Sequence, residues 1–405
     1  MTGICRSLCA GAFALICSAA ASGSPQPAQV ALYVKTRGSA QHAVGRATIP
    51  ATIMRDLTKG AAAASLEILS QNGGKALVCA VLDPWEASDR HNATVFFPGR
   101  CPSGLLRVSS TAPSQPRKLT ERTVISGGGA RFAFDPAVQA GLPHEIHFGT
   151  DEAVQPLASH SWNDRLYHSQ RGGWMLRYDR SPKVSVVLDT PQLTVVRTAA
   201  RYCREDGTPE PTGAEAVYDW YILRNSPEVF VQTFVRQKEA QEWHELHHLE
   251  LNVSDARFTG WLGGGAAGGA LKADRKGWLT ERWGALVDGG DPATSPKAEV
   301  RSVVALIAPT VRFYDGRGEY GTYVHGAWES WNARQRMLSA WLWVGRTTDP
   351  AKVVAEAAGA VRAANVAVTR TDLERRIASL RRSPTTRWLG VIAEGYRTRG
   401  DLEMA

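Results

Sequence analysis

The feature that most constrains the fold is a long series of short segments in which apolar and polar residues alternate, found throughout residues 124–345. Alternation with a period of two is typical of β-strands, and many such strands at short spacing favour an antiparallel sandwich. The clearest segments are 173–178, 184–188, 193–202, 216–223, 229–236, 303–308 and 338–344. We therefore predict a mainly β protein with a large antiparallel β-sandwich.

Smaller alternating segments precede this region, and a different pattern follows it. We predict a small N-terminal β domain over residues 22–122 and the large β-sandwich over residues 123–346. After that, residues 351–364 are rich in alanine, which favours a helix. We expect a short C-terminal helical segment over 347–405, either packed on the sandwich or forming the opening of a helical domain that is cut short.

The N-terminus has the layout of a secretory signal peptide. Arg6 precedes an apolar stretch over residues 8–16, and the alanines at 19–21 supply the small residues that a cleavage site needs. We predict a signal peptide over residues 1–21 and export to the periplasm or the extracellular space.

The cysteines that remain after export could form a disulfide. After cleavage at that site, Cys79, Cys101 and Cys203 remain. We expect Cys79 and Cys101 to be the pair available for a disulfide in an oxidising compartment, and whether they are bridged stays open.

The formal net charge of +8 is unevenly distributed, because arginines crowd into residues 362–399. An exported chain rarely meets nucleic acid, so an anionic polysaccharide or oligosaccharide is the partner that fits this charge better. Beyond the first two dozen residues no apolar run is long enough to span a bilayer. We therefore expect a glycan partner, no nucleic acid and no stable insertion into a membrane.

The sequence His244-Glu245-x-x-His248 matches a zinc-hydrolase pattern, in which two histidines one helical turn apart bind the metal. That pattern requires a helix, whereas this segment lies among strand-like segments. On a strand, His244 and His248 share one face with Glu250, where they can transfer protons or bind a cation. We favour no cofactor and no metal ligand, leaving a divalent cation and a zinc-dependent hydrolase as alternatives.

Two further clusters combine residues that can carry chemistry. A glycine-rich turn after residue 315 places Arg317 near Tyr323 and His325, and tyrosine with histidine is a common acid and base pair. Upstream, Trp162, Asn163 and Arg165 lie in a polar and aromatic stretch without apolar periodicity, which is typical of a functional loop.

Tryptophan side chains present flat apolar faces on which sugar rings stack, and most tryptophans of this chain lie between residues 162 and 343. Those in polar surroundings are the expected sugar-stacking residues: Trp162, Trp243, Trp261, Trp328 and Trp331.

Several of these stretches together resemble a known family. Residues 161–165, 216–220, 243–248 and 314–318 lie within a region that resembles the many-stranded β-supersandwich of galactose-mutarotase-like proteins. Within that group, the region is most similar to exo-acting rhamnogalacturonan lyase-type proteins, which carry a smaller β domain ahead of the sandwich. The resemblance implies a polysaccharide lyase that acts by β-elimination on a uronate-containing glycan.

This chemistry assigns roles by residue type. Elimination needs the uronate carboxylate to be neutralised, a base for the C5 proton and an acid for the leaving oxygen. Neutralisation suits Asn163 and Arg165. The catalytic candidates are His244 or His248 as the base and Tyr323 or His325 as the acid, while Trp162, Trp243, Trp328 and Arg317 are expected to bind substrate.

A non-catalytic protein with the same surface is the main alternative. The predicted helical segment is short, whereas lyases of this sandwich type often pair the sandwich with a large helical domain. The chain could therefore be a glycan-binding module, or the remnant of a larger lyase, that binds a glycan without turnover.

Overall fold

The computed structural model describes residues 30–36, 42–70, 73–85, 90–100, 103–149, 160–253, 258–264, 268–271, 278–289, 299–316 and 321–370. These residues form mostly antiparallel β-sheet with two short α-helices, one of them near the C-terminal end, as the sequence predicted. No helix in these ranges combines the length and apolar character needed to cross a membrane. The predicted signal peptide lies outside the described residues.

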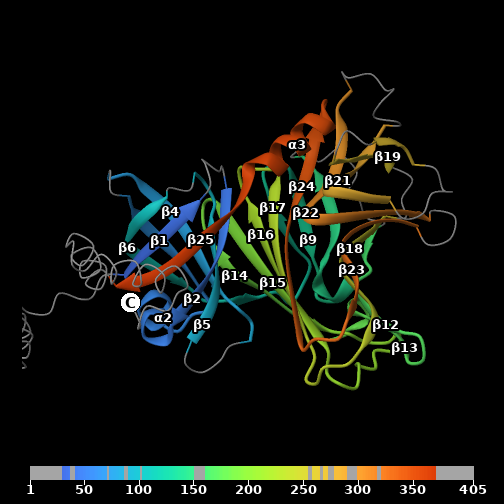
Figure 1. Cartoon of the computed structure of the whole chain (residues 1–405), viewed down its shortest axis with the longest axis horizontal. Helices are drawn as coiled ribbons and strands as arrows, with labels where there is room; N and C mark the ends of the chain where they lie inside the picture. Colours follow the sequence, from blue (N-terminus) through green and yellow to red (C-terminus); the bar gives the residue numbers. More distant parts are fainter. Residues whose placement is uncertain are drawn as a thin grey trace, which may run out of the picture.

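The first unit is a closed barrel, at the left of Figure 1, with strand order β1-β25-β2-β5-β4-β3-β6. Its strands are β1 (Val30–Thr36), β2 (His42–Pro50), β3 (Ala63–Leu69), β4 (Lys75–Leu82), β5 (Arg90–Phe97), β6 (Gly104–Ser114) and β25 (Val361–Arg370). The helix α2 (Ala51–Thr58) joins β2 to β3 and buries Ile53, Met54 and Leu57 in the barrel core. Closure between β1 and β6 leaves no free sheet edge.

The strand β25 corrects one sequence-based expectation. We expected one alanine-rich helix over residues 351–364, but α3 (Pro350–Ala360) ends at Ala360 and the chain continues as β25. This strand pairs antiparallel with β1 and parallel with β2, so hydrogen bonds to sequence-distant strands override the helix propensity of alanine. The rest of the predicted helical segment, from residue 371 onward, lies outside the described residues.

The second unit is a large sheet, with a three-stranded sheet of order β10-β9-β8 against the same core. The small sheet contains β8 (Thr123–Ser126), β9 (Ala130–Phe134) and β10 (Pro143–Phe148). The main path of the large sheet runs β13-β12-β18-β23-β22-β24-β17-β16-β15-β14-β7. Its strands, with those that branch from this path, are β7 (Arg117–Lys118), β11 (His160–Trp162), β12 (Arg165–His168), β13 (Gly172–Met175), β14 (Lys183–Asp189), β15 (Leu193–Arg201), β16 (Glu215–Leu223), β17 (Glu228–Arg236), β18 (Trp243–Val253), β19 (Phe258–Gly263), β20 (Gly268–Ala270), β21 (Trp278–Asp288), β22 (Arg301–Gly316), β23 (Gly321–Trp331) and β24 (Gln335–Thr347).

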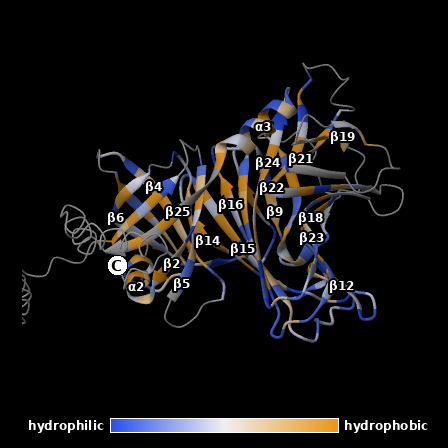
Figure 2. Cartoon of the chain, viewed as in Figure 1, coloured by the Kyte–Doolittle hydropathy of each residue, from blue (hydrophilic) through white to orange (hydrophobic). Residues whose placement is uncertain are grey.

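The middle strands of this sheet are buried on both faces, which explains their nearly continuous apolar sequences (Figure 2). In β16, Tyr218 and Trp220 face the sandwich core, whereas Tyr221 faces the barrel. There the ring of Phe96 from β5 lies 5.2 Å from that of Tyr221 and 5.7 Å from that of Trp341. The barrel and the sandwich therefore share an aromatic interface.

Cys79 lies in this interface as a buried free thiol, and burial raises its pKa to about 12. The disulfide that we expected is therefore not formed at Cys79, and Cys101 lies outside the described residues.

Low pH is expected to destabilise the protein through His42, which lies between the barrel and the sandwich. This histidine is buried, and its ring is stacked on that of Trp341. Burial lowers the pKa of His42 below its ordinary value of 6.5, because the buried site disfavours the charged ring. The unfolded chain therefore binds this proton more readily, so the free energy of unfolding falls as the pH drops below 6.5. Urea unfolding of wild type and His42→Phe at about pH 7 and about pH 5 measures the effect. A smaller acid loss in the variant is expected, and equal losses would contradict the assignment.

Candidate functional site

A pocket of about 270 Å³ lies at one end of the large sheet and is lined by polar and aromatic side chains. The chain segments that build it are β12, β18, β22, β23 and the link between β11 and β12. The lining residues are Asn163, Arg165, His247, Glu250, Tyr314, Tyr323, His325 and Trp328.

A β-bulge interrupts the alternation of side chains along β18, and this interruption brings two of its polar side chains into the pocket. Between its pairing with β11 at Leu251 and with β12 at His247, β18 contains one residue more than the opposing chain. Leu249, within this bulge, has a φ of 54°, in the left-handed region that leucine rarely adopts. Because the extra residue resets the side-chain alternation, His247 and Glu250 reach the same pocket although they are three residues apart.

The carboxyl group of Asp164 holds the bulge. It accepts hydrogen bonds from the backbone N–H of Leu249 at 3.0 Å and of Glu250 at 2.7 Å, and from the Tyr218 hydroxyl. Burial raises the pKa of Asp164 to about 8, while the two backbone donors oppose that shift. One buried side chain thus fixes the strained backbone next to the pocket.

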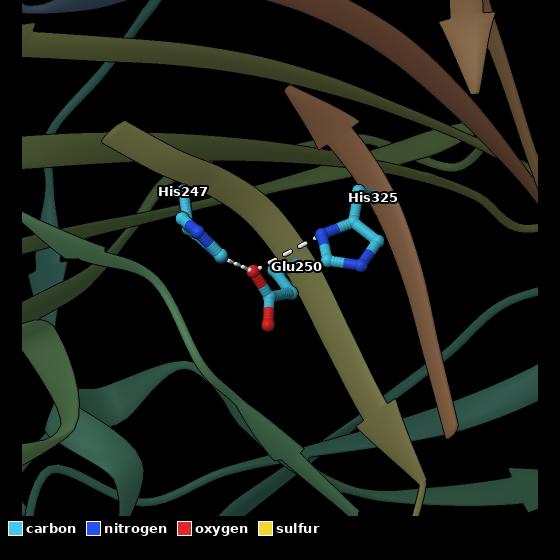
Figure 3. Close-up of side chains that lie close together, drawn as sticks. All are labelled: His247, Glu250 and His325. Atoms are coloured by element: carbon cyan, nitrogen blue, oxygen red, sulfur yellow. Dashed lines mark hydrogen bonds and ion pairs between the residues drawn. The ribbon is translucent and has the colours of Figure 1, made fainter. Parts of the chain in front are cut away.

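At the inner end of the pocket, Glu250 lies between two histidines (Figure 3). Its Oε2 atom pairs with Nδ1 of His247 and lies 3.1 Å from Nδ1 of His325, while the Asn163 side chain donates to its Oε1 at 3.1 Å. All three ionisable side chains are buried. Burial favours the protonated carboxyl, but the two histidines outweigh it and hold the pKa of Glu250 well below its usual range.

A second carboxylate orients His247 from the other side. Glu245 lies 3.0 Å from Nε2 of His247 and accepts a hydrogen bond from Arg165 at 2.8 Å. The hydrogen bond to His247, together with Arg165, lowers the pKa of Glu245 to about 2 despite partial burial. Burial disfavours a charged His247 ring, yet its hydrogen bonds to the two glutamates raise its pKa overall.

Aromatic rings form the remaining walls. The His325 ring stacks on Tyr323 at 5.6 Å and on Trp328 at 5.5 Å between ring centroids. Burial raises the pKa of Tyr323 to about 12, so its hydroxyl is protonated near neutral pH. A groove of about 460 Å³ adjoins the pocket, because both share His325 and Trp328.

The structure brings five of the sequence-predicted residues into this pocket and places the other described candidates elsewhere. Inside it are Asn163, Arg165, Tyr323, His325 and Trp328. Arg317 lies outside the described residues. The indoles of Trp162 and Trp243 are buried in the sandwich core with Trp261 and Trp331, because their strands turn these faces inward.

The two motif histidines, His244 and His248, do not meet in the pocket. His248 is buried against the ring of Tyr218, and burial lowers its pKa to about 3. His244 is exposed and stacks on His168, with ring centroids 4.4 Å apart. Since the motif lies on strand β18 and one of its histidines is sealed in the core, it lacks the helical arrangement of a zinc hydrolase.

Sequence reasoning missed His247, Glu250 and Tyr314 as parts of one site. The regular alternation that we assumed for β18 puts His247 on the face opposite Glu250. Only the bulge at Leu249 brings them together, and a leucine gives no sequence signal for a left-handed backbone. The register of β22 with β23, which pairs Tyr314 with Tyr323, also depends on tertiary structure.

Comparisons with known proteins find structures that are similar in fold. No family model matches the chain, and neither does any curated protein. A galactose mutarotase related enzyme from Lactobacillus acidophilus is 10% identical, covers 57% of this chain and 99% of its own, and has a TM-score of 0.34. A protein in glycosyl hydrolase family 38 from Enterococcus faecalis is 9% identical, covers 85% of this chain and 48% of its own, and has a TM-score of 0.45.

An α-N-acetylgalactosaminidase from Bifidobacterium bifidum is 11% identical, covers 54% of this chain and 36% of its own, and has a TM-score of 0.36. Galactose mutarotase-like proteins are thus among the structural neighbours, as the sequence resemblance led us to expect. Likenesses at these scores do not assign the chain to a family. The chemistry of the pocket is therefore the basis for its function.

Proposed function

We propose that the protein is an exported carbohydrate-active enzyme that cleaves a uronate-containing glycan by β-elimination in this pocket. One observation carries the proposal: a guanidinium, a side-chain amide, two imidazoles, a carboxylate and two phenols converge beside an indole. These are the groups that elimination requires, and Trp328 adds a flat face for a sugar ring.

The first requirement is to bind and neutralise the uronate carboxylate. Arg165 and Asn163 line the pocket, and each is held from behind by a glutamate, Glu245 for Arg165 and Glu250 for Asn163. Hydrogen-bond donors fixed in this way stabilise negative charge that develops on the substrate carboxylate when C5 loses its proton.

The second requirement is proton transfer on both sides of the bond that breaks. We assign His325 as the base that takes the C5 proton and Tyr323 as the acid that protonates the leaving glycosidic oxygen. The C5–H and C4–O bonds break, a C4=C5 double bond forms, and no water is consumed. The rings of the two residues are stacked, with centroids 5.6 Å apart, and both residues line the pocket.

The shape of the site fits a sugar with neighbours attached. Small-molecule pockets commonly measure ~300–1,000 Å³, so this pocket of about 270 Å³ suits a single sugar ring. The adjoining groove of about 460 Å³ gives an attached residue a place to lie, with Trp328 shared between the two. The occupant we propose is therefore an oligosaccharide or polysaccharide with an acidic residue at the pocket.

Ultraviolet absorbance of unsaturated uronate products tests this function. The protein without residues 1–21 is incubated with pectic, ulvan-like and glycosaminoglycan polysaccharides, each with and without a chelator. We expect absorbance to rise with one class of glycan. Glycan binding without any rise would contradict the lyase and favour a non-catalytic binding module.

A further inference from the structure

We propose that His247, Glu250 and His325 form a binding site for a divalent transition-metal ion, with Zn²⁺ as its representative. The geometry points to this site because each residue offers one ligand atom and these atoms all lie within 4.8 Å of one another. The site differs from the His244-Glu245-x-x-His248 pattern, because neither motif histidine takes part.

The donor set suits such an ion. Two imidazole nitrogens and one carboxylate oxygen are ligands that Zn²⁺ and neighbouring first-row ions accept, whereas Ca²⁺ and Mg²⁺ prefer oxygen alone. Three protein ligands leave a further coordination position. Here that position faces the pocket, because all three side chains line it.

Outer contacts hold both side chains so that a metal ion could replace the proton that His247 and Glu250 share. The carboxylate of Glu245, 3.0 Å away, is the nearest partner of His247 Nε2, so that nitrogen carries a proton and Nδ1 points toward Glu250. Asn163 donates to Oε1 of Glu250, which leaves Oε2 between the two rings. A carboxylate that fixes a histidine from behind is a common outer partner in metal sites.

His325 provides an independent observation. Its side chain is 3% exposed, and its Nε2 atom has no hydrogen-bond partner among the described residues. Its Nδ1 atom forms an ion pair with Oε2 of Glu250 at 3.1 Å. A buried nitrogen without a partner is unfavourable in a folded protein, and a metal ion in the pocket is a partner that His325 could accept.

Metal binding has a consequence that rests on the proposed function. An imidazole that ligates an ion has no lone pair left on that nitrogen, and the ion would hold the His325 ring in place. Ion occupancy and removal of the C5 proton by His325 therefore compete, so bound Zn²⁺ is expected to inhibit elimination.

Calorimetric titration of the mature protein with Zn²⁺ tests the site without any glycan. We expect one tight site per chain, weakened at least tenfold in His325→Ala and in the near-isosteric Glu250→Gln. The control His244→Ala, which removes an exposed histidine outside the pocket, should bind as wild type does. Circular dichroism confirms that each variant is folded.

The absorption spectrum of Co²⁺-loaded protein gives a second readout, since its visible bands report nitrogen and oxygen ligands. Absence of a tight site, or equal affinity in wild type, His325→Ala and Glu250→Gln, would overturn the proposal. Failure of the proposed function gives a different result, because Zn²⁺ would still bind while no glycan yields an unsaturated product.

Discussion

Replacing Tyr323 with phenylalanine is expected to lower kcat for glycan elimination by about 10²- to 10⁴-fold, the usual contribution of a general acid. The variant loses only the hydroxyl, so the ring that stacks on His325 stays in place and folding should be unchanged. Because the ring keeps its place in the pocket lining, KM should change little. Initial rates of product absorbance over a range of glycan concentrations separate the two parameters.

The matched control is Tyr167→Phe, which removes a tyrosine hydroxyl from the exposed side of β12 outside the pocket. This control should retain wild-type kinetics. If Tyr323→Phe retained wild-type kcat as well, Tyr323 would not be the acid, and the proton-transfer assignment would be wrong.

Replacing Asp164 with alanine is expected to reduce the free energy of unfolding by roughly 3–5 kcal/mol, because three buried donors lose their acceptor. These donors are the N–H groups of Leu249 and Glu250 and the Tyr218 hydroxyl. Without this acceptor the left-handed backbone at Leu249 loses its support, so Glu250 should no longer be held between the histidines. Urea unfolding measures the loss, and the folded fraction should show weakened Zn²⁺ binding.

Asp206→Ala provides the comparison, because this exposed aspartate accepts local hydrogen bonds from Thr208 in a turn. In Asp206→Ala the free energy of unfolding should fall by less than about 1 kcal/mol. Equal destabilisation in the two variants, or normal Zn²⁺ binding by Asp164→Ala, would show that Asp164 does not position the cluster.

Strands with clear alternation could be predicted from the sequence. The expected segments 184–188, 193–202 and 216–223 correspond to β14 (Lys183–Asp189), β15 (Leu193–Arg201) and β16 (Glu215–Leu223). Burial on one or both sheet faces imposes this pattern on local sequence. The strand β25 could not be predicted in the same way, because its alanines favour a helix and its partners β1 and β2 lie more than 300 residues earlier.

The candidate site was predictable only in its residue types. Asn163, Arg165, Tyr323 and His325 belong to polar clusters that carry chemistry, and the fold brings them together. The choice of His247 over His248 depends on one extra residue in β18, which no local pattern reveals. Trp162 and Trp243 were expected to bind substrate but are buried in the core. Polar neighbours in sequence do not reveal which face a strand buries.

Mass spectrometry of glycan fragments formed in heavy-oxygen water tests the central claim most directly. Elimination in the pocket consumes no water, so the account predicts unsaturated fragments, lighter by one water than hydrolysis products and free of the heavy label. With Tyr323→Phe these fragments should form about 10²- to 10⁴-fold more slowly. Saturated fragments carrying the heavy oxygen would show hydrolysis instead and would contradict the assignment of this pocket to β-elimination.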